Sequence, residues 1–264
     1  MIYINNKEKI KNIKLEKNNF YVVADFDKTL TDGNSYSTWK VLADSNEIGE
    51  EYTKKRTDLY NYYRPIEINN NISDEEKSKA MSEWWEAHIN LFYEYGLKED
   101  GIKNGILNGE LKYREGAKRF LHEMKQLEIP VIIISAGIGN IIEEFLKFEN
   151  DYFDNIHIVS NYINFENGHI KNLKGDTIHE LNKNIVKLDN TSKELLVNRR
   201  NILLLGDGIA DLKMISESDK ENAITVGFLE EKVEENLEYF NGVFDIVIIN
   251  NGTFNDVNKI LKIY

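Results

Sequence analysis

Two aspartates one residue apart are the clearest candidates for chemistry in this chain. Asp25 and Asp27 lie in the sequence DFDKTLT (residues 25–31), directly behind the apolar run Phe20–Ala24. The run predicts a buried strand, and open α/β sheets bind ligands at the carboxyl ends of such strands. A buried carboxylate is costly unless a cation or hydrogen bonds compensate for its charge, so a hard divalent metal is the expected partner. An aspartate that begins a turn or caps a helix would also explain the pattern.

A second candidate site follows the apolar run Val131–Ile134, where the chain continues with Ser135, Ala136 and Gly137. A hydroxyl group and free backbone N–H groups at the start of a helix form an anion site. Ser135 and the amide of Ala136 or Gly137 could therefore bind phosphate oxygens. The alternative is a serine that caps a helix, followed by glycines that allow a tight turn.

A third strand end carries the sequence GDGIAD (residues 206–211), behind the apolar run Ile202–Leu205. If a helix begins here, the four-residue spacing brings Asp207 and Asp211 toward the same side. Paired acids at a strand-to-helix junction fit Mg²⁺, which keeps several waters and takes few protein carboxylates. The alternative is an ordinary surface turn.

A parallel sheet is the arrangement that would gather these three strand ends at one edge. Further apolar runs alternate with helical periodicity, as in Ile141–Phe148 and Leu212–Ser216, which is typical of an α/β fold covered on both faces. The expected strands are Phe20–Ala24, Val131–Ile134, Ile156–Val159, Ile202–Leu205, Ala223–Val226 and Asp245–Ile249. Asn167-Gly168 between alternating segments predicts a β-hairpin after the third strand, and the tail after Asp245 would add an edge strand and a final helix.

The long stretch between the first and second strands has no convincing strand pattern and repeated helical patterns. Ser73 and Glu76 have the spacing of a capping box, and Gly96 is a plausible end for the helix that follows. We therefore expect a helical cap at residues 33–110, inserted after the first strand of an α/β core formed by residues 1–32 and 111–264.

Composition narrows the class of partner. The 264 residues include 33 Lys+Arg and 45 Asp+Glu, a net charge of −12, and no basic block, which argues against a nucleic-acid partner. The absence of cysteine excludes disulfides and thiol chemistry. The first residues lack a signal-peptide pattern, and no apolar run approaches the roughly 18 residues of a membrane helix. We expect a cytoplasmic protein without a membrane partner; the oligomeric state stays open.

Taken together, DFDKTLT, the strand ending at Ser135, a later lysine and GDGIAD resemble the four motifs of the haloacid dehalogenase-like phosphohydrolase superfamily. Further segments resemble the cytosolic pyrimidine 5′-nucleotidase family: SAGIG (135–139), SNY (160–162), IHELNK (178–183), VGFL (226–229), FDIVI (244–248), YYRPIEI (62–68) and MSEWW (81–85). That family removes the 5′-phosphate of nucleoside monophosphates with Mg²⁺. The resemblance implies a Rossmann-like parallel-sheet core and a small phosphomonoester substrate.

The resemblance also implies roles for the acids. Asp25 would attack phosphorus and form an aspartyl-phosphate, while Asp27 would protonate the leaving oxygen and then activate water. The carboxylates of Asp25 and Asp207 and the backbone carbonyl of Asp27 would bind Mg²⁺, with Asp211 ordering the metal's surroundings.

Phosphate binding falls, by the same resemblance, to Ser135, the amide of Ala136 and a lysine. Lys183 in the Leu-Asn-Lys context matches the family's phosphate-binding lysine, and a cation there would offset charge on the transferring group. Lys187 is a rival. Either could instead be one more solvated lysine in a Lys-rich chain.

The helical insert would choose the substrate. Glu67 matches a family glutamate that contacts the nucleobase, and Trp84 and Trp85 could provide a stacking face. Aromatic residues at helical spacing usually fill a core, which is the alternative for both. His88 stands where the family often has a smaller polar residue, so the identity of the base stays open; a lone histidine is more often packed than a ligand.

Other readings remain at this point. A cation-pumping ATPase shares the Asp-Lys-Thr sequence but needs membrane helices. A phosphoserine-type or other small-metabolite phosphatase shares the core and the position of the insert. A non-catalytic phosphate-binding module of the same fold would not need to keep Asp25, Asp27, Lys183 and Asp207 together.

Overall fold

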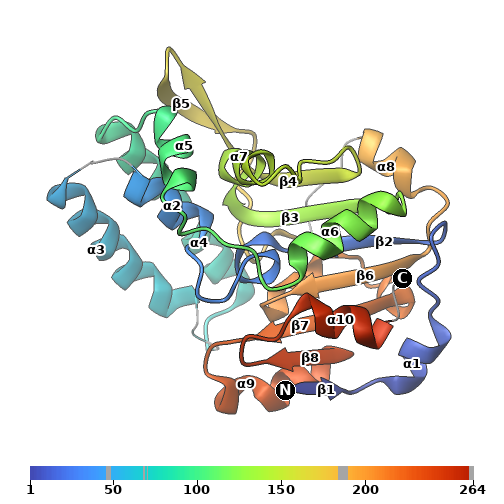
Figure 1. The fold of residues 1–264 in the computed structure, drawn as a ribbon. Helices are drawn as coiled ribbons and strands as arrows, with labels where there is room; N and C mark the ends of the chain where they lie inside the picture. The colour runs from blue at the N-terminus through green and yellow to red at the C-terminus, as the bar shows by residue number, and fades with distance from the viewer. Residues whose placement is uncertain (46–48, 68, 70, 184–189, 262–264) are drawn as a thin grey trace.

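The computed structural model of the chain describes residues 1–45, 49–67, 69, 71–183 and 190–261 (Figure 1). Eight strands form one sheet in the order β1-β8-β7-β6-β2-β3-β4-β5. The strands are β1 (Ile2–Ile4), β2 (Phe20–Ala24), β3 (Val131–Ile138), β4 (Ile156–Glu166), β5 (His169–Lys174), β6 (Asn201–Gly206), β7 (Ala223–Leu229) and β8 (Ile246–Ile249). All pairings between neighbours are parallel except those of β1 with β8 and of β5 with β4.

Helices cover both faces of this sheet and extend past one end of it. They are α1 (Lys7–Asn12), α2 (Thr38–Ser45), α3 (Glu50–Glu67), α4 (Asp74–Glu94), α5 (Asp100–Leu107), α6 (Ala117–Gln126), α7 (Gly139–Phe148), α8 (Asn190–Leu196), α9 (Val233–Val243) and α10 (Phe254–Leu261). Short irregular helices follow two of the strands: the π-type turn η1 (Phe26–Leu30) and the 3₁₀ helix η3 (Ile209–Met214). A further 3₁₀ turn, η4 (Lys220–Asn222), precedes β7.

The predicted strands are present because their apolar runs are buried on both faces, as parallel strands require. Alternate residues of β2 belong to the two apolar clusters on opposite faces of the sheet. Val22 and Ala24 belong to the cluster that includes α6, α7 and α10, whereas Val23 belongs to the cluster that includes α9. β3 runs to Ile138 and is buried throughout. The predicted third strand and the first arm of the hairpin are one continuous strand, β4.

Two sequence expectations need correction, and one strand was not expected. The amino terminus supplies a strand, β1, which pairs with β8, so the tail strand β8 does not lie at the edge of the sheet. Three residues are too short a run for a sequence signal, and the partner strand provides the rest. The helical turn expected at Leu212–Ser216 is instead the 3₁₀ helix η3, which starts three residues earlier and ends at Met214.

Helices α2 to α5 lie between β2 and β3 in the chain and gather at one end of the sheet (Figure 1). The predicted capping box is formed: Ser73 Oγ accepts from Glu76 N at 3.3 Å and Ser73 N donates to Glu76 Oε2 at 3.4 Å. α4 ends at Glu94, two residues before Gly96 with its left-handed φ of 68°. Trp39 and Phe92 join the same buried apolar cluster as the sheet, so this insert packs firmly on the core.

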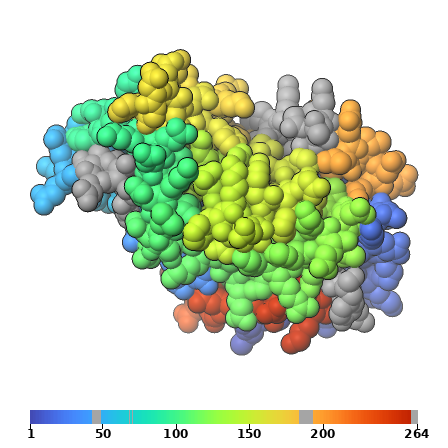
Figure 2. Space-filling model, turned by 45° about the horizontal axis from the view of Figure 1, so that its top comes forward, coloured from blue at the N-terminus to red at the C-terminus, as the bar shows by residue number. Residues whose placement is uncertain are grey.

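The hairpin β4–β5 closes one side of the insert. Figure 2 shows it in yellow, standing beside the green helical segment that contains α5. Backbone hydrogen bonds join the two: Glu99 N donates to Gly168 O at 3.0 Å and Ile170 N donates to Leu97 O at 3.3 Å. Among the described residues, no helix is both long enough and apolar enough to cross a membrane.

Candidate active site

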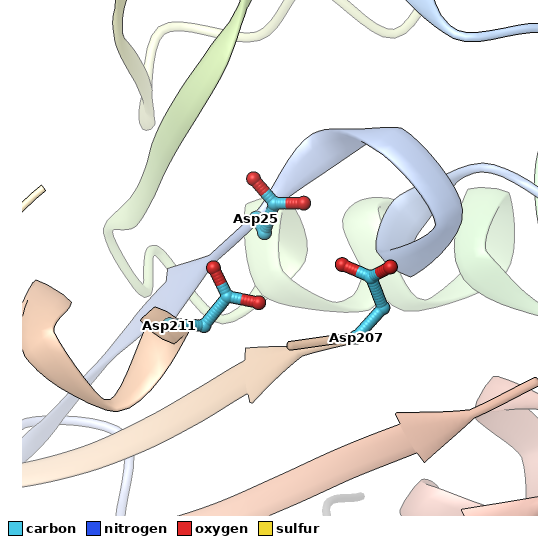
Figure 3. Close-up of side chains that lie close together, drawn as sticks. All are labelled: Asp25, Asp207 and Asp211. Carbon is cyan, nitrogen blue, oxygen red and sulfur yellow. The ribbon is translucent and has the colours of Figure 1, made fainter. Parts of the chain in front are cut away.

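Three aspartates converge at the carboxyl ends of neighbouring strands (Figure 3). Asp25 follows β2, Asp207 follows β6, and Asp211 comes from η3; one carboxylate oxygen of each lies within 4.8 Å of the others. The register explains the convergence, because Ala24 pairs with Leu205, so the two strands end side by side. The expected gathering of distant strand ends is therefore present.

Glycine makes the approach of Asp211 possible. A methyl group at Gly206 would lie 2.5 Å from Asp211 Oδ2, closer than any side chain tolerates. The backbone N–H of Gly208 donates to the same oxygen at 2.9 Å. The loop that precedes Asp211 thus holds its carboxylate. Asp207 and Asp211 lie close together, as their four-residue spacing predicted, although the helix that begins between them is 3₁₀ rather than α.

Lys183 lies between two of the acids. Its Nζ is 2.8 Å from Asp25 Oδ1 and 2.6 Å from Asp211 Oδ1, and all three residues are buried. Burial raises the pKa of Asp25 well above the usual value, while the charge of Lys183 lowers it. Burial alone would lower the pKa of Lys183, but Asp211 and Asp25 raise it well above the usual lysine value. The rival Lys187 lies outside the described residues.

The acids outnumber the lysine, which makes the cluster suitable for a hard cation. Both oxygens of Asp211 already accept hydrogen bonds, from Lys183 and from Gly208. Asp207 accepts no hydrogen bond from the described part of the chain, and burial and the charge of Asp211 raise its pKa well above the usual value. The donor set therefore fits a metal held by Asp25 and Asp207, with Asp211 as a fixed neighbour.

Asp27, three residues after the end of β2, contacts the first turn of α2 and not the cluster of three aspartates. Its Oδ1 accepts from Thr38 N at 2.9 Å and its Oδ2 from Thr38 Oγ1 at 3.0 Å. Burial raises the pKa of Asp27 to about 6, although both hydrogen bonds from Thr38 lower it. Sequence reasoning missed Thr38, because nothing in the pattern of residues 32–57 points to this contact.

A buried arginine holds the loop that carries both aspartates. The Arg114 guanidinium donates to Thr29 O at 3.0 Å, to Lys28 O, to Gly252 O at 2.9 Å and to Glu230 Oε1 at 2.6 Å. Lys28 itself adopts a left-handed φ of 58°. Arg114 is a second residue that sequence reasoning missed, since a single arginine before a helix carries no signal.

The phosphate-site candidates lie at the end of β3. Ser135 is buried, and its Oγ accepts from Gly137 N at 3.0 Å. Helix α7 begins only at Gly139, with Ile138 at its N-cap position, so the alternative of Ser135 as a helix cap is wrong. Ser135, Ala136 and Gly137 line the same cavity of about 540 Å³ as Asp25, Asp27 and Asp207.

Charged residues from the core and the insert also line this cavity. Lys28 Nζ lies 2.5 Å from Glu231 Oε1, and Arg64 NH1 lies 2.5 Å from Glu67 Oε2. Arg64 also approaches Glu231 at 3.9 Å, which joins the two pairs across the cavity. Glu67 also lines this cavity, where it already has a cationic partner.

An aromatic pocket of about 390 Å³ adjoins the cavity and shares Ser37, Trp39 and Trp85 with it. The Trp39 and Trp85 rings are stacked with centroids 4.0 Å apart, and His88 lies 5.3 Å from Trp39. Trp84 and His88 also line this pocket. Trp39 is a third residue that sequence reasoning missed.

Three ring nitrogens from residues that line the aromatic pocket are unpaired in the part of the chain that the structure describes. Trp84 Nε1 and both ring nitrogens of His88 are buried without a hydrogen-bond partner among the described residues. Burial lowers the pKa of His88 to about 4, so its ring is neutral near pH 7. Buried donors and acceptors without partners are rare in proteins, so these nitrogens keep unused hydrogen-bonding capacity.

Comparisons with known proteins agree with one another. The sequence model of the family described as pyrimidine 5′-nucleotidase (UMPH-1) matches residues 24–264. The 7-methylguanosine phosphate-specific 5′-nucleotidase A of Xenopus laevis is 39% identical over 250 residues, 91% of this chain and 86% of that protein. A crystal structure of cytosolic 5′-nucleotidase IIIB bound to cytidine superposes with a TM-score of 0.86 at 25% identity, over 99% of this chain and 93% of that one. A substrate-bound phosphoserine phosphatase complex reaches a TM-score of 0.61 at 18% identity, over 92% and 98% of the two chains, and shares the fold alone.

Proposed function

The chain belongs to the pyrimidine 5′-nucleotidase (UMPH-1) family and is a 5′-nucleotidase, and from this premise we propose how its own residues act. Asp25 is the nucleophile and Asp27 is the acid and base. An Asp25 oxygen attacks phosphorus as the bond to the nucleoside oxygen breaks, and Asp27 gives that oxygen a proton. Water then attacks the aspartyl-phosphate, Asp27 takes a proton from it, and inorganic phosphate leaves as Asp25 is restored.

Binding groups surround the transferring phosphoryl group. Ser135 Oγ and the Ala136 amide hold its oxygens, and the Lys183 ammonium, 2.8 Å from Asp25 Oδ1, offsets its charge. Asp25, Asp207 and the Asp27 backbone carbonyl hold Mg²⁺, and Asp211 orders their surroundings. When bound, the ion neutralises charge between the nucleophile and the phosphate. The donor set, with Asp25 and Asp211 buried and Asp207 half-buried, supports this choice of a hard cation.

The substrate is a nucleoside 5′-monophosphate whose base enters the aromatic pocket. Flat rings stack on indoles, and the indoles of Trp39, Trp84 and Trp85 line this pocket. Glu67, at the edge of the catalytic cavity, suits an exocyclic amino group. The names of the relatives point to 7-methylguanosine monophosphate and cytidine monophosphate as the first substrates to test.

Substrate choice and chemistry fall to different parts of the chain. Residues 33–110 form a specificity cap, and residues 1–32 and 111–264 form the phosphohydrolase core. Glu67, Trp84, Trp85 and His88 all come from α3 and α4, whereas the acids come from strand ends of the sheet. The cytosolic name of the similar nucleotidase supports a cytoplasmic location.

The observation that carries the proposal is the shared wall of the two cavities. Trp39 and Trp85 line both the catalytic cavity and the aromatic pocket, so a phosphate near Asp25 and a base among the indoles fit one ligand. A phosphoserine would leave the aromatic pocket empty.

Phosphate release from a panel of monoesters tests this assignment. The panel contains 7-methylguanosine, cytidine, uridine and guanosine monophosphates, phosphoserine and a sugar phosphate, each with Mg²⁺ and with chelator. We expect one or more nucleotides to rank first and chelator to stop turnover. A higher kcat/KM for phosphoserine or the sugar phosphate would overturn the substrate assignment, and full activity in chelator would overturn the metal assignment.

A further inference from the structure

Thr38 is a buried polar residue that the reaction described above does not use. It is fully buried at the first position of α2, where Ser37 Oγ caps the helix by accepting from Lys40 N at 3.3 Å. The backbone N–H of Thr38 is one of the donors that a helix leaves unpaired in its first turn. That donor bonds to Asp27 Oδ1 at 2.9 Å.

The hydroxyl of Thr38 fixes the second oxygen of the same carboxyl group. Ile138 N donates to Thr38 Oγ1 at 3.0 Å, so the hydroxyl accepts on one side and its single hydrogen is directed to Asp27 Oδ2, 3.0 Å away. Two bonds to the two oxygens define the plane of the carboxyl group. Both donors belong to one residue of the insert, and the bond from Ile138 ties that residue to β3.

The surroundings leave Thr38 no room to move. A methyl group at Gly137 would lie 2.2 Å from Thr38 Oγ1, so glycine is what allows β3 and α2 to come this close. The neighbouring Trp39 adds a second tie, because its Nε1 donates to Ala136 O at 3.1 Å. The first turn of α2 is therefore fixed to the strand end that carries the phosphate-site residues.

We infer that Thr38 is a positioning residue that orients the Asp27 carboxyl group for proton transfer to the leaving oxygen. This inference rests on the acid and base role proposed for Asp27. Proton transfer needs a short, aligned contact, and a displacement of about 1 Å can cost about 100-fold in rate. Thr38 itself touches no reacting atom; it acts through Asp27.

The test compares leaving groups of different proton demand. A nucleoside alkoxide must receive a proton as the phosphorus–oxygen bond breaks, whereas p-nitrophenolate leaves as a stable anion. Rapid-mixing measurements give the rate of aspartyl-phosphate formation from cytidine monophosphate (or 7-methylguanosine monophosphate, whichever is hydrolysed faster) and from p-nitrophenyl phosphate. The ratio of the two rates does not depend on how much of a variant is correctly folded.

Thr38→Val removes the hydroxyl at nearly constant volume, and Thr38→Ser keeps it. For Thr38→Val we expect formation from the nucleotide to slow by about 10- to 100-fold and formation from p-nitrophenyl phosphate by less than about threefold, since acid catalysis contributes about 10²–10⁴-fold. Thr38→Ser should restore most of the nucleotide rate. Equal slowing of both substrates, or an unchanged nucleotide rate, would overturn the inference.

Asp27→Asn separates failure of this inference from failure of the proposed mechanism. If Asp27→Asn itself shows no preference for the better leaving group, the acid role of Asp27 is wrong. If Asp27→Asn shows the preference and Thr38→Val does not, only the role of Thr38 is wrong. In the double variant, Thr38→Val should add less than about threefold to the loss from Asp27→Asn, because a residue that acts through another has little left to do without it.

Discussion

Lys183 and Asp25 illustrate how one pair of residues can serve both stability and reaction. Their ion pair is buried, and removing one partner of such a pair commonly costs about 3–5 kcal/mol because the other charge stays buried alone. Asp25 also lies close to Asp207 and Asp211. Removing its charge therefore relieves repulsion between these acids, which opposes the loss of the ion pair with Lys183. The two substitutions should therefore differ in their effect on stability.

We expect Asp25→Asn to abolish turnover, because an amide cannot form the aspartyl-phosphate, and to leave the fold intact. Its unfolding free energy should change less than that of Lys183→Met, which leaves Asp25 and Asp211 facing each other at the cluster. Urea unfolding and phosphate release from the best nucleotide measure both effects. Turnover near the wild-type rate in Asp25→Asn would contradict the covalent mechanism.

The buried imidazole of His88 makes the unfolding free energy depend on pH. Burial lowers its pKa to about 4, below the value of about 6.5 in an unfolded chain. The unfolded state therefore binds more protons between these values, and the unfolding free energy rises with pH there. The stability that comes from keeping His88 neutral and buried is fully present above about pH 6.5 and is lost as the pH falls toward 4.

Replacing His88 with phenylalanine keeps a flat ring beside Trp39 and removes the titration. Between pH 7.5 and pH 5.5, wild type should lose about 1 kcal/mol more unfolding free energy than His88→Phe. The lower pH stays above the isoelectric point of about 5.0. His179, whose pKa burial also lowers to about 4, is present in both proteins and cancels. Parallel pH dependences of the two proteins would contradict this account.

Among the elements, the turn η1 has an unusual dependence on a distant side chain. Arg114 donates hydrogen bonds to the backbone carbonyls of Lys28 and Thr29 in this turn. The planar Arg114 guanidinium also lies over the Phe228 ring, 4.3 Å from its centroid. Arg114 and Phe228 lie more than a hundred residues apart in the chain. The loop that follows β2 is therefore shaped by tertiary contacts more than by its own sequence.

Arg114→Met should lower the unfolding free energy by about 3–5 kcal/mol, since it strands the Glu230 carboxylate and several backbone carbonyls. Arg114→Lys should recover little, because an ammonium group cannot reproduce the planar fork of donors. Glu230→Gln in the Arg114→Met background should return part of the loss by removing the unpaired charge. Wild-type stability of Arg114→Lys in urea unfolding would show that charge alone, without the fork, holds the turn.

Across the whole molecule, the sheet and its catalytic edge were predictable, and the contacts between the insert and the core were not. Apolar runs such as Val131–Ile134 predict buried strands by themselves. The motifs that follow such runs predict that Asp25 and Asp207 lie at the carboxyl ends of strands. The short strand β1 exists only through pairing with β8, more than two hundred residues later. Thr38, Trp39 and Arg114 each make a contact with a residue far away in the chain, so no local pattern marks them.

The whole protein carries an excess of negative charge, part of which is concentrated at the strand ends. With a net charge of −12 and Asp25, Asp207 and Asp211 within one cluster, the folded state without a cation carries repulsion that a cation would relieve. Ligand binding to the native state adds about 2.7 kcal/mol of stability at a ligand concentration of 100 times Kd. We expect Mg²⁺ to raise Tm and chelator to reverse the shift.

Asp207→Asn should abolish that shift and leave the metal-free protein at least as stable as wild type, because the substitution removes one of the repelling charges. Asp154→Asn is the matched control, since Asp154 is 90% exposed and precedes β4 at the opposite end of the strands. It should keep the full Mg²⁺ response. A Mg²⁺ shift that survives in Asp207→Asn would place the cation elsewhere on this acidic molecule, whereas loss of the shift in that variant alone ties the ion to the junction of β2 and β6.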